Sequence, residues 1–172
     1  MYLHKMIKIL GIGVMTLMMA GCDGSSDSDT PPSTPTPPPS ESWPEGLGSS
    51  QDISTTDAYA MLKNDRGIVF VDIRRVEEYN AKHAYVDTDP AIDPINEPAY
   101  TAADVLYENF VEDMKAYVGY DPDVPVYLIC NTARRTGNAT DLLVANGFNN
   151  VYDILGGTNK WEADGLPMRY GQ

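Results

Sequence analysis

The sequence is 172 residues long and carries 25 acidic against 12 basic side chains, a net charge of −13 at pH 7. This acidity argues against binding to nucleic acid, or to anionic lipid through a basic face, because both of those partners are densely negative. The length allows one domain of ordinary size together with an appended segment.

The first 21 residues have the composition of an export signal. Two lysines give a basic start, an apolar stretch runs over 9–19, and small residues precede Cys22. The apolar stretch is shorter than the roughly 20 residues of a membrane-spanning helix. Its end resembles the lipobox of bacterial lipoproteins, which are cleaved before the cysteine and lipidated on it, although Met19 stands where leucine is usual. We therefore expect a signal peptide over 1–21 and lipid on Cys22, with an uncleaved N-terminal anchor as the alternative.

The stretch 24–42 consists almost entirely of Ser, Asp, Thr and Pro, which is typical of a disordered tether with polyproline character. At ~3.1 Å per residue, about 20 residues of this kind reach roughly 60 Å. The sequence thus predicts a lipidated cysteine and tether over 22–42 and a folded domain over 43–172. Such a protein would be anchored by lipid on the periplasmic side of a bacterial membrane. Asp23 resembles the inner-membrane retention signal of enteric bacteria, but the inner and the outer membrane both remain open.

With Cys22 lipidated, Cys130 is the only free thiol of the mature chain, since the sequence has two cysteines. An exported protein without an internal disulfide must be stabilised by its core. The lone thiol is then either buried filler or a reactive group, and the residues around it decide between the two.

Apolar periodicity predicts that strands and helices alternate along the domain. In chain order we expect a short helix capped by Thr55 or Thr56, a buried strand 68–71 ending at Asp72, a helical turn 77–82, a surface excursion 84–100, an amphipathic helix over 103–117, a turn 121–125, a buried strand 126–129, a helix 136–146 and a strand 151–155. The strands are continuously apolar, which predicts a three-layer α/β fold with a central parallel sheet and helices on both faces. Ligands of such sheets bind beyond the carboxyl ends of the strands.

Cys130 stands where the strand 126–129 ends and the next helix begins. The first turn of a helix has unpaired backbone N–H groups and a partial positive charge, which favour a thiolate over a thiol and also bind anions. Arg134 and Arg135 follow in the same turn. We therefore expect a thiolate and an oxyanion to meet in one small cradle.

Three motifs in this order resemble the rhodanese family of sulfurtransferases. Residues 71–83 contain an Asp-x-Arg strand end followed by Glu-Tyr and a histidine, and residues 147–167 contain Gly-Gly-Thr-Asn-Lys-Trp and then Gly-Leu-Pro. Between them, Cys130 is followed five residues later by Arg135, and its Cys-Asn-x-x-Arg opening is similar to that of small periplasmic single-domain rhodaneses. The resemblance spans about residues 53–168.

The resemblance implies a rhodanese-like fold and a thiosulfate sulfurtransferase type of enzyme. Cys130 would attack the outer sulfur of thiosulfate or a similar donor, keep it as a persulfide and pass it to a thiophilic acceptor. Arg135 occupies the family's loop-closing position, and its planar donor fork suits a sulfonate. Arg134 either shares that role or points to solvent. The other loop residues expected at the substrate are Asn131, Thr132, Ala133 and Thr136, the last as a helix cap or as a donor to the anion.

Asp72, Arg74 and Glu78 are expected from the resemblance to support the base of the active loop and not to take part in the chemistry. His83 is expected to be a hydrogen-bonded structural residue, and Trp161 a core residue. No cofactor is implied, and one cysteine with one histidine makes a metal site unexpected in this domain.

The sequence departs from the family pattern at three places. Lys82 stands where a glycine is usual, Ala133 stands where a loop glycine is common, and the segment 84–95 is longer and more acidic than the usual link. An alanine in the loop restricts how freely the backbone turns there.

Three other functions stay open on the sequence. The domain could be a tethered sulfur-binding or interaction module without turnover, or a redox-sensing thiol, because a thiolate is also oxidisable. A phosphatase or arsenate reductase of the same fold is the third, although four residues between Cys130 and Arg135, one fewer than in those enzymes, favour a sulfur-sized pocket. The expected partners are a small sulfur-containing anion, a thiol acceptor (a small molecule or a protein) and the membrane through lipid only, with no nucleic acid. The sequence predicts no oligomeric state.

Overall fold

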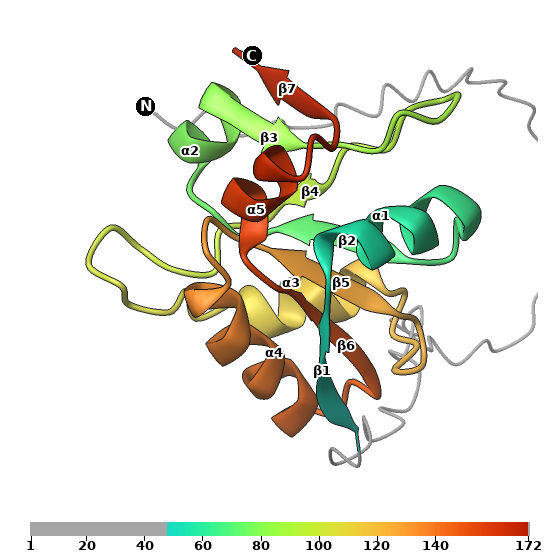
Figure 1. Cartoon of the computed structure of the whole chain (residues 1–172). Coiled ribbons are helices and arrows are strands. Elements are labelled where there is room, and N and C mark those ends of the chain that lie inside the picture. The colour runs from blue at the N-terminus through green and yellow to red at the C-terminus, as the bar shows by residue number, and fades with distance from the viewer. Residues whose placement is uncertain (1–47, 172) are drawn as a thin grey trace, which may run out of the picture. The chain divides into compact units, whose positions relative to one another are not determined.

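The computed structural model describes residues 48–171 of the chain (Figure 1). The expected signal peptide, the lipidated Cys22 and the tether lie outside the described residues. Within 48–171, no helix combines the length and the hydropathy that crossing a membrane requires.

A five-stranded parallel sheet forms the centre of the domain. Its strands are β1 (Ser49–Ile53), β2 (Val69–Asp72), β4 (Ile95–Asn96), β5 (Val126–Ile129) and β6 (Asn150–Ile154), in the spatial order β1-β6-β5-β2-β4. Leu128 in β5 pairs with Val71 in β2 on one side and with Asp153 in β6 on the other. This register brings the carboxyl ends of β2, β5 and β6 to the same edge of the sheet.

Helices cover both faces of the sheet (Figure 1). They are α1 (Thr55–Asn64), α2 (Val76–Ala81), α3 (Phe110–Tyr117), α4 (Arg134–Ala145) and α5 (Gly157–Ala163). The buried side chains form two clusters, because alternate strand residues point to opposite faces. Phe110 of α3 and Leu143 of α4 pack against one face, and Leu62 of α1 and Trp161 of α5 belong to the cluster of the other. The predicted three-layer α/β fold is confirmed.

A second, small sheet pairs β3 (Lys82–Ala84) with β7 (Met168–Tyr170) in antiparallel fashion. It joins the segment after α2 to the C-terminal end of the described chain, and α5 contacts β3.

Two helix starts differ from the sequence prediction. The cap of α1 is Ser54, whose Oγ accepts the N–H of Asp57 at 3.1 Å, so the prediction of a threonine cap one or two residues later is wrong. Helix α4 begins at Arg134 and not two residues later, because the left-handed Ala133 makes the turn into the helix.

The amphipathic helix predicted over 103–117 is wrong over its first part. Helix α3 begins only at Phe110, and the residues before it form a turn in which Thr101 Oγ1 accepts two backbone N–H groups, both at 3.2 Å. Asp104 has φ 56°, a left-handed conformation that a helix cannot contain.

The segment 84–100, predicted as a surface excursion, is partly core. Ala84, Val86 and Ala99 are fully buried, and Val86 forms an isolated bridge with Ile92. The prediction is wrong at these positions because β4 pairs with β2 at the sheet edge and carries its neighbours against the core.

Candidate active site

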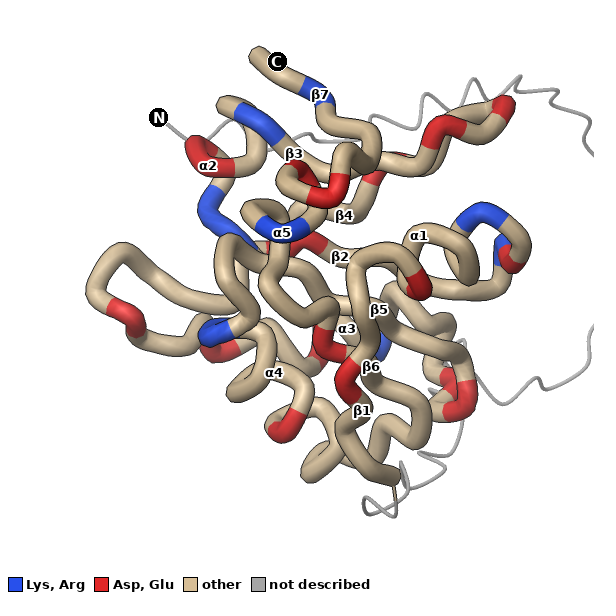
Figure 2. The backbone as a smooth tube through the Cα atoms, in the orientation of Figure 1, with Lys and Arg blue, Asp and Glu red and all other residues tan. Residues whose placement is uncertain are grey.

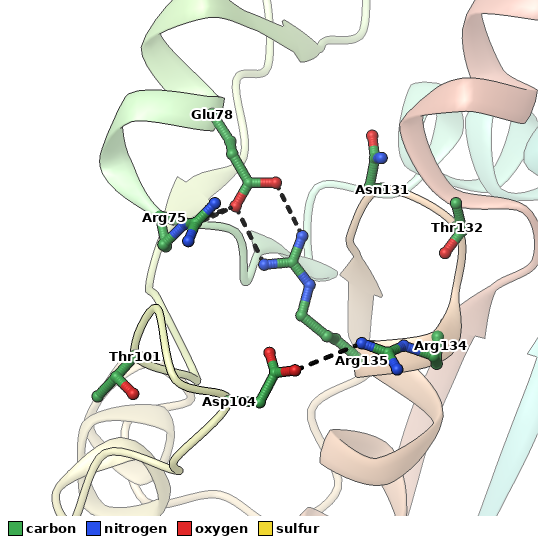
Figure 3. A pocket seen from close by; sticks show the side chains of 8 residues that line it. All are labelled: Arg75, Glu78, Thr101, Asp104, Asn131, Thr132, Arg134 and Arg135. Carbon is green, nitrogen blue, oxygen red and sulfur yellow. Dashed lines mark hydrogen bonds and ion pairs between the residues drawn. The ribbon is translucent and has the colours of Figure 1, made fainter.

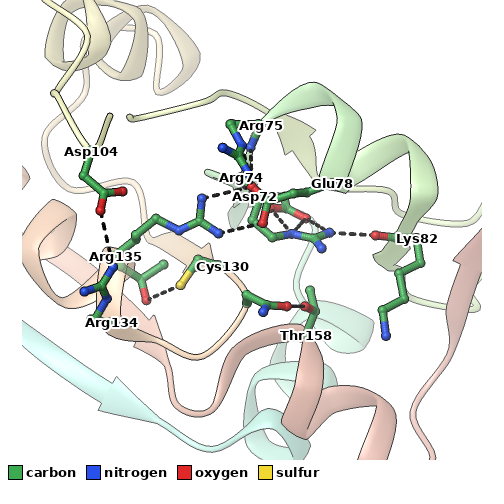
Figure 4. A network of polar contacts seen from close by, with 12 residues as sticks. Asp72, Arg74, Arg75, Glu78, Lys82, Asp104, Cys130, Arg134, Arg135 and Thr158 are labelled. Atoms are coloured by element: carbon green, nitrogen blue, oxygen red, sulfur yellow. Dashed lines mark hydrogen bonds and ion pairs between the residues drawn. The ribbon is translucent and has the colours of Figure 1, made fainter. Parts of the chain in front are cut away.

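Cys130 follows β5 directly and lies at the carboxyl edge of the sheet, between β5 and α4 (Figure 4). Its side chain is buried, with 1% of the residue exposed. The register of the sheet places the ends of β2 and β6 beside it, so residues far apart in the sequence converge on the thiol.

The loop after Cys130 is held by the first turn of α5. The N–H of Thr158 donates to the Cys130 carbonyl at 2.8 Å, and the N–H of Asn159 donates to the Asn131 carbonyl at 3.2 Å. Gly157 makes this approach feasible, because a Cβ at that position would lie 2.3 Å from the Cys130 carbonyl oxygen. Gly157, the second residue of the double glycine, therefore serves the geometry of the active loop.

Ala133 completes the loop in the left-handed conformation, with φ 68°. An alanine there costs more than the glycine that is common at this position, because its Cβ crowds the carbonyl that follows. The hydrogen-bond ladder of α4 begins with the N–H of Gly137 donating to the Ala133 carbonyl at 3.0 Å. The N–H groups just before it lie in the first turn of the helix, where anions are favoured.

A pocket of about 240 Å³ opens beside this loop (Figure 3). It is smaller than the roughly 300–1,000 Å³ of sites for drug-sized ligands. Its lining comes from three parts of the chain: Arg75 and Glu78; Thr101 and Asp104; Asn131, Thr132, Arg134 and Arg135. Acidic residues are spread over most elements of the domain (Figure 2), whereas three arginines meet at this pocket. The lining also holds two carboxylates, Glu78 and Asp104, so the three arginines leave one positive charge in excess, which favours a small anion despite the negative net charge of the chain.

Arg135 enters the pocket and is held there by Glu78. Its Nη1 and Nη2 donate to the two carboxylate oxygens at 3.1 and 2.9 Å, and Arg75 Nε donates to the same carboxylate at 3.1 Å. The hydrogen bonds from Arg135 hold the pKa of Glu78 below its ordinary value, against the opposing effect of burial. Glu78, expected only as a support, thus lies in the pocket wall itself.

Arg134 stands at the mouth of the pocket. Its side chain is 79% exposed, and its Nη2 lies 3.5 Å from a carboxylate oxygen of Asp104 (Figure 3). The guanidinium thus lines the pocket and reaches solvent, and its share in holding an anion stays a prediction.

Thr136 lies below the loop and does not cap the helix. The N-cap position is Ala133, so the predicted capping role of Thr136 is wrong. Its Oγ1 lies 3.6 Å from Cys130 Sγ, 3.0 Å from the Ala133 carbonyl and 2.5 Å from Asp153 Oδ1. The hydroxyl thus connects the thiol to a buried carboxyl group on β6.

The chain is similar to known proteins over most of the described domain. The family model described as Rhodanese-like domain matches residues 54–164. The chain belongs to the rhodanese family. It is 27% identical over 117 residues to the thiosulfate sulfurtransferase GlpE of Actinobacillus pleuropneumoniae, covering 68% of this chain and 91% of that protein. It is 30% identical over 120 residues to the chloroplastic thiosulfate sulfurtransferase 16 of Arabidopsis thaliana, with the same two coverages.

A solved structure is similar to this chain in both fold and sequence. The polysulfide-sulfur transferase homodimer of Wolinella succinogenes has a TM-score of 0.52 and 28% sequence identity, over 70% of this chain and 78% of that one. Together with the two sulfurtransferases, it places the chain among sulfurtransferase-type proteins.

Asp72 and Arg74 form a buried ion pair at the end of β2. Arg74 Nε and Nη2 donate to the Asp72 carboxylate at 2.6–3.0 Å, and both side chains are at most 3% exposed. Arg74 Nη2 also donates to the Lys82 carbonyl at 2.8 Å (Figure 4). The pair joins the end of β2 to the start of β3 and does not line the pocket, so it supports the segment that carries Glu78.

His83 and Trp161 are both buried and hydrogen-bonded. His83 Nδ1 contacts the Tyr79 carbonyl at 3.1 Å, and its ring stacks on that of Tyr79 at 4.0 Å. Trp161 Nε1 donates to the Pro167 carbonyl at 2.9 Å. Among the described residues there is no group of three or more His, Cys, Asp or Glu side chains placed to hold a metal ion.

Four residues of the site were not predicted from the sequence. Arg75, Thr101 and Asp104 line the pocket, and Asp153 contacts Thr136. Arg75 directly follows the Asp-x-Arg motif and stands three residues before Glu78, so the helical spacing of these two residues predicts their contact. The other three come from distant segments and have no local signal in the sequence.

Proposed function

We propose that this rhodanese-family protein moves sulfane sulfur from thiosulfate or a similar anionic donor to a thiophilic acceptor through a persulfide on Cys130. The observation that supports this proposal most strongly is the position of Cys130. It follows β5 directly, four residues before α4 begins, and the loop after it contributes Asn131, Thr132, Arg134 and Arg135 to the lining of a small pocket, whereas the buried Cys130 itself is not part of that lining. The names of the two sulfurtransferase relatives support thiosulfate as the donor, and the Wolinella protein suggests polysulfide as another.

In the first step the Cys130 thiolate attacks the outer sulfur of the donor. A Cys130 Sγ–S bond forms, the S–S bond of thiosulfate breaks, and sulfite leaves with the electron pair. In the second step an acceptor such as cyanide or a thiolate attacks the outer sulfur of the persulfide, and the Cys130 thiolate is released. The first turn of α4 would stabilise the anionic sulfur in both steps.

Arg135 would hold the sulfonate end of the donor during loading. Its side chain lines the pocket and is 19% exposed, so a donor gains from a partly desolvated guanidinium. When the persulfide sulfur passes to a small acceptor (the discharge step), no sulfonate group has to be held. Loss of this side chain is therefore expected to affect loading more than discharge.

The two half-reactions separate these roles in an experiment. Arg135→Ala should lower the efficiency of loading by thiosulfate roughly ten- to a hundredfold, which corresponds to about 1.5–3 kcal/mol for a charge-assisted contact. Arg66→Ala is the matched control, because it removes the same charge from the turn after α1, where Arg66 contacts the Pro90 carbonyl. Cys130→Ser should abolish both steps. Equal loss of loading and discharge in Arg135→Ala would contradict the proposed role of Arg135.

We also propose, from the sequence of the first 42 residues, that the mature chain is lipidated on Cys22 and works on the periplasmic side of a membrane. Cys22→Ala should release the protein into the soluble periplasmic fraction or leave it unprocessed. A variant that is still processed and still membrane-bound would contradict the lipid anchor.

A further inference from the structure

Asp153 is a buried carboxyl group with an unusual lack of partners. It is 5% exposed, and within the described part of the chain its hydrogen-bond partner is the Thr136 hydroxyl, at 2.5 Å. A buried carboxylate is normally compensated by a cation or by several N–H donors. Here Gly137 of α4 leaves room for the second oxygen, because even a Cβ at that glycine would lie 3.6 Å from Asp153 Oδ2.

The groups that face Asp153 from the neighbouring elements make its ionisation harder. Asp52 stands opposite it on β1, Asp141 lies on α4, and Cys130 follows β5. Burial raises the pKa of Asp153, and the negative charges of Asp52 and Asp141 raise it further, while the Thr136 hydrogen bond opposes this rise. The neutral form of the carboxyl group is therefore easier to reach than in an exposed aspartate.

A single hydroxyl proton connects this carboxyl group with the nucleophile. Thr136 Oγ1 lies 2.5 Å from Asp153 Oδ1 and 3.6 Å from Cys130 Sγ, so the two acidic atoms are no more than about 6 Å apart. Thr136 has one proton to donate. When Asp153 is ionised, that proton points to the carboxylate and leaves the sulfur without it. When Asp153 is neutral, its own proton points to Thr136, whose hydroxyl proton is then free to turn to the thiolate at 3.6 Å or to the Ala133 carbonyl at 3.0 Å, and the negative charge of a thiolate makes it the stronger acceptor.

We propose that Asp153 is a positioning residue for the Cys130 nucleophile, which stores the proton of the thiol through the Thr136 hydroxyl. The S–H bond of Cys130 breaks and its electron pair stays on the sulfur. The proton bonds to Thr136 Oγ1, the original hydroxyl proton passes to Asp153 Oδ1, and the charge of the three groups stays at one negative unit. Cys130 and Asp153 then titrate as one coupled pair, in which the thiolate coexists with a neutral carboxyl group.

The titration of the thiolate tests this role without any sulfur substrate, although its catalytic meaning rests on the proposed function. The readout is the ultraviolet absorbance of the full chain against pH, with that of the Cys130→Ser chain subtracted to remove the tyrosines and Cys22. In the wild type the thiolate should appear in two steps. Asp153→Asn keeps the shape and can donate to Thr136 but cannot take the proton. It should give one step, about 1–2 pH units below the upper wild-type step, because a negative charge about 6 Å away is removed.

Asp121→Asn is the matched control. The change is chemically the same, Asp121 lies in the turn at the opposite end of β5, and the new amide oxygen still accepts the N–H of Asp123. Its titration should coincide with that of the wild type. Thr136→Val removes the connecting hydroxyl at nearly the same size. The through-space effect of the Asp153 charge stays in that background and the part carried by the hydroxyl is lost, so Asp153→Asn should cause a smaller shift; an equal shift would contradict the role of Thr136.

Superimposable thiolate titrations of the wild type and Asp153→Asn would overturn the inference, even with a changed melting temperature, because Asp153 would then only join β6 to α4. A shift of Asp153→Asn to higher pH would overturn it as well. If Asp153→Asn does not fold, Asp52→Asn serves instead. It removes a negative charge that raises the pKa of Asp153, so less thiolate should form while Asp153 keeps its proton, and the low-pH step should become smaller. An unchanged low-pH step would refute the coupling. A shifted titration without any sulfur loading would instead count against the proposed function alone.

Discussion

Replacing Glu78 by glutamine is expected to weaken the fold and, at the same time, to tighten the binding of an anionic sulfur donor. The Glu78 carboxylate accepts one N–H of Arg135 at each oxygen, at 2.9 and 3.1 Å, and also the Nε–H of Arg75. A glutamine keeps the shape but puts an NH₂ donor where one acceptor was. One bond to Arg135 and the ionic attraction are lost, and Arg135 has no resident anion until a donor enters.

The magnitudes follow from the exposure of the pair. A hydrogen bond to a charged group contributes about 1.5–3 kcal/mol. The side chains of Arg135 and Glu78 are 19% and 25% exposed, so solvent screens part of this. We expect the free energy of unfolding to fall by about 1–2 kcal/mol. A donor anion ~6 Å from the Glu78 carboxylate is repelled by roughly 1 kcal/mol at an intermediate dielectric, so the KM for thiosulfate should fall about three- to tenfold.

Urea unfolding measures the first effect, and steady-state transfer of sulfur from thiosulfate to cyanide measures the second. Glu77→Gln is the control, since it changes the charge equally at an exposed position on the same helix. It should leave both quantities nearly unchanged. A higher KM in Glu78→Gln would refute the reasoning, because Glu78 would then be needed to aim Arg135 at the donor and would not compete with it.

Three further predictions concern the loop and its ion pair. Ala133→Gly should raise the free energy of unfolding, measured with urea, by up to about 1 kcal/mol. Glycine removes the strain of the left-handed alanine at φ 68°, and the greater flexibility of the unfolded chain offsets part of this gain. A loss of stability would show that the methyl group packs favourably. Gly157→Ala should lower the free energy of unfolding by about 3 kcal/mol or more and reduce sulfur loading, because the new Cβ would lie 2.3 Å from the Cys130 carbonyl oxygen. Gly119→Ala is the control: it has a similar φ of 63° but nothing within 4 Å of the new Cβ, so it should lower the free energy of unfolding by only about 1 kcal/mol. The lowered pKa of Glu78 contributes stability that is present above its ordinary pKa of 4.5 and is lost as the pH falls through the lowered pKa. The urea midpoint of the wild type should therefore drop more steeply below pH 4.5 than that of Glu78→Gln. Parallel curves for the two proteins would contradict this.

Strands buried on both faces were predictable, and exposed or very short ones were not. β5 is apolar along its length and β2 is apolar up to Asp72, and both are almost wholly buried, so a continuous apolar run identified them. β1 has the sequence Ser-Ser-Gln-Asp-Ile, with four exposed residues, because it is an edge strand that needs no apolar run. β3, β4 and β7 have two or three residues each. The seven-residue α5 begins at the second residue of a double glycine, a pair that normally predicts a turn.

The candidate site divides in the same way between local and distant residues. Asn131, Thr132, Arg134 and Arg135 come from one loop, so the position of Cys130 at a strand end was enough to place them together. Asp104 joins the pocket through a left-handed turn that apolar periodicity misread as helix. Asp153 approaches the thiol only because β6 pairs with β5 in a particular register, with Asp153 opposite Leu128. A pairing register of parallel strands is fixed by the whole sheet, and no local pattern in the sequence reveals it.

Mass spectrometry of the intact protein after incubation with thiosulfate tests the central claim most directly. The wild type should gain the mass of one sulfur atom on Cys130 and lose it again when cyanide is added, and Cys130→Ser should gain nothing, because a neutral hydroxyl is a far weaker nucleophile than a thiolate. A wild-type protein that takes up no sulfur from thiosulfate or polysulfide, yet hydrolyses an aryl phosphate, would contradict sulfur transfer and favour the phosphatase chemistry of the same fold.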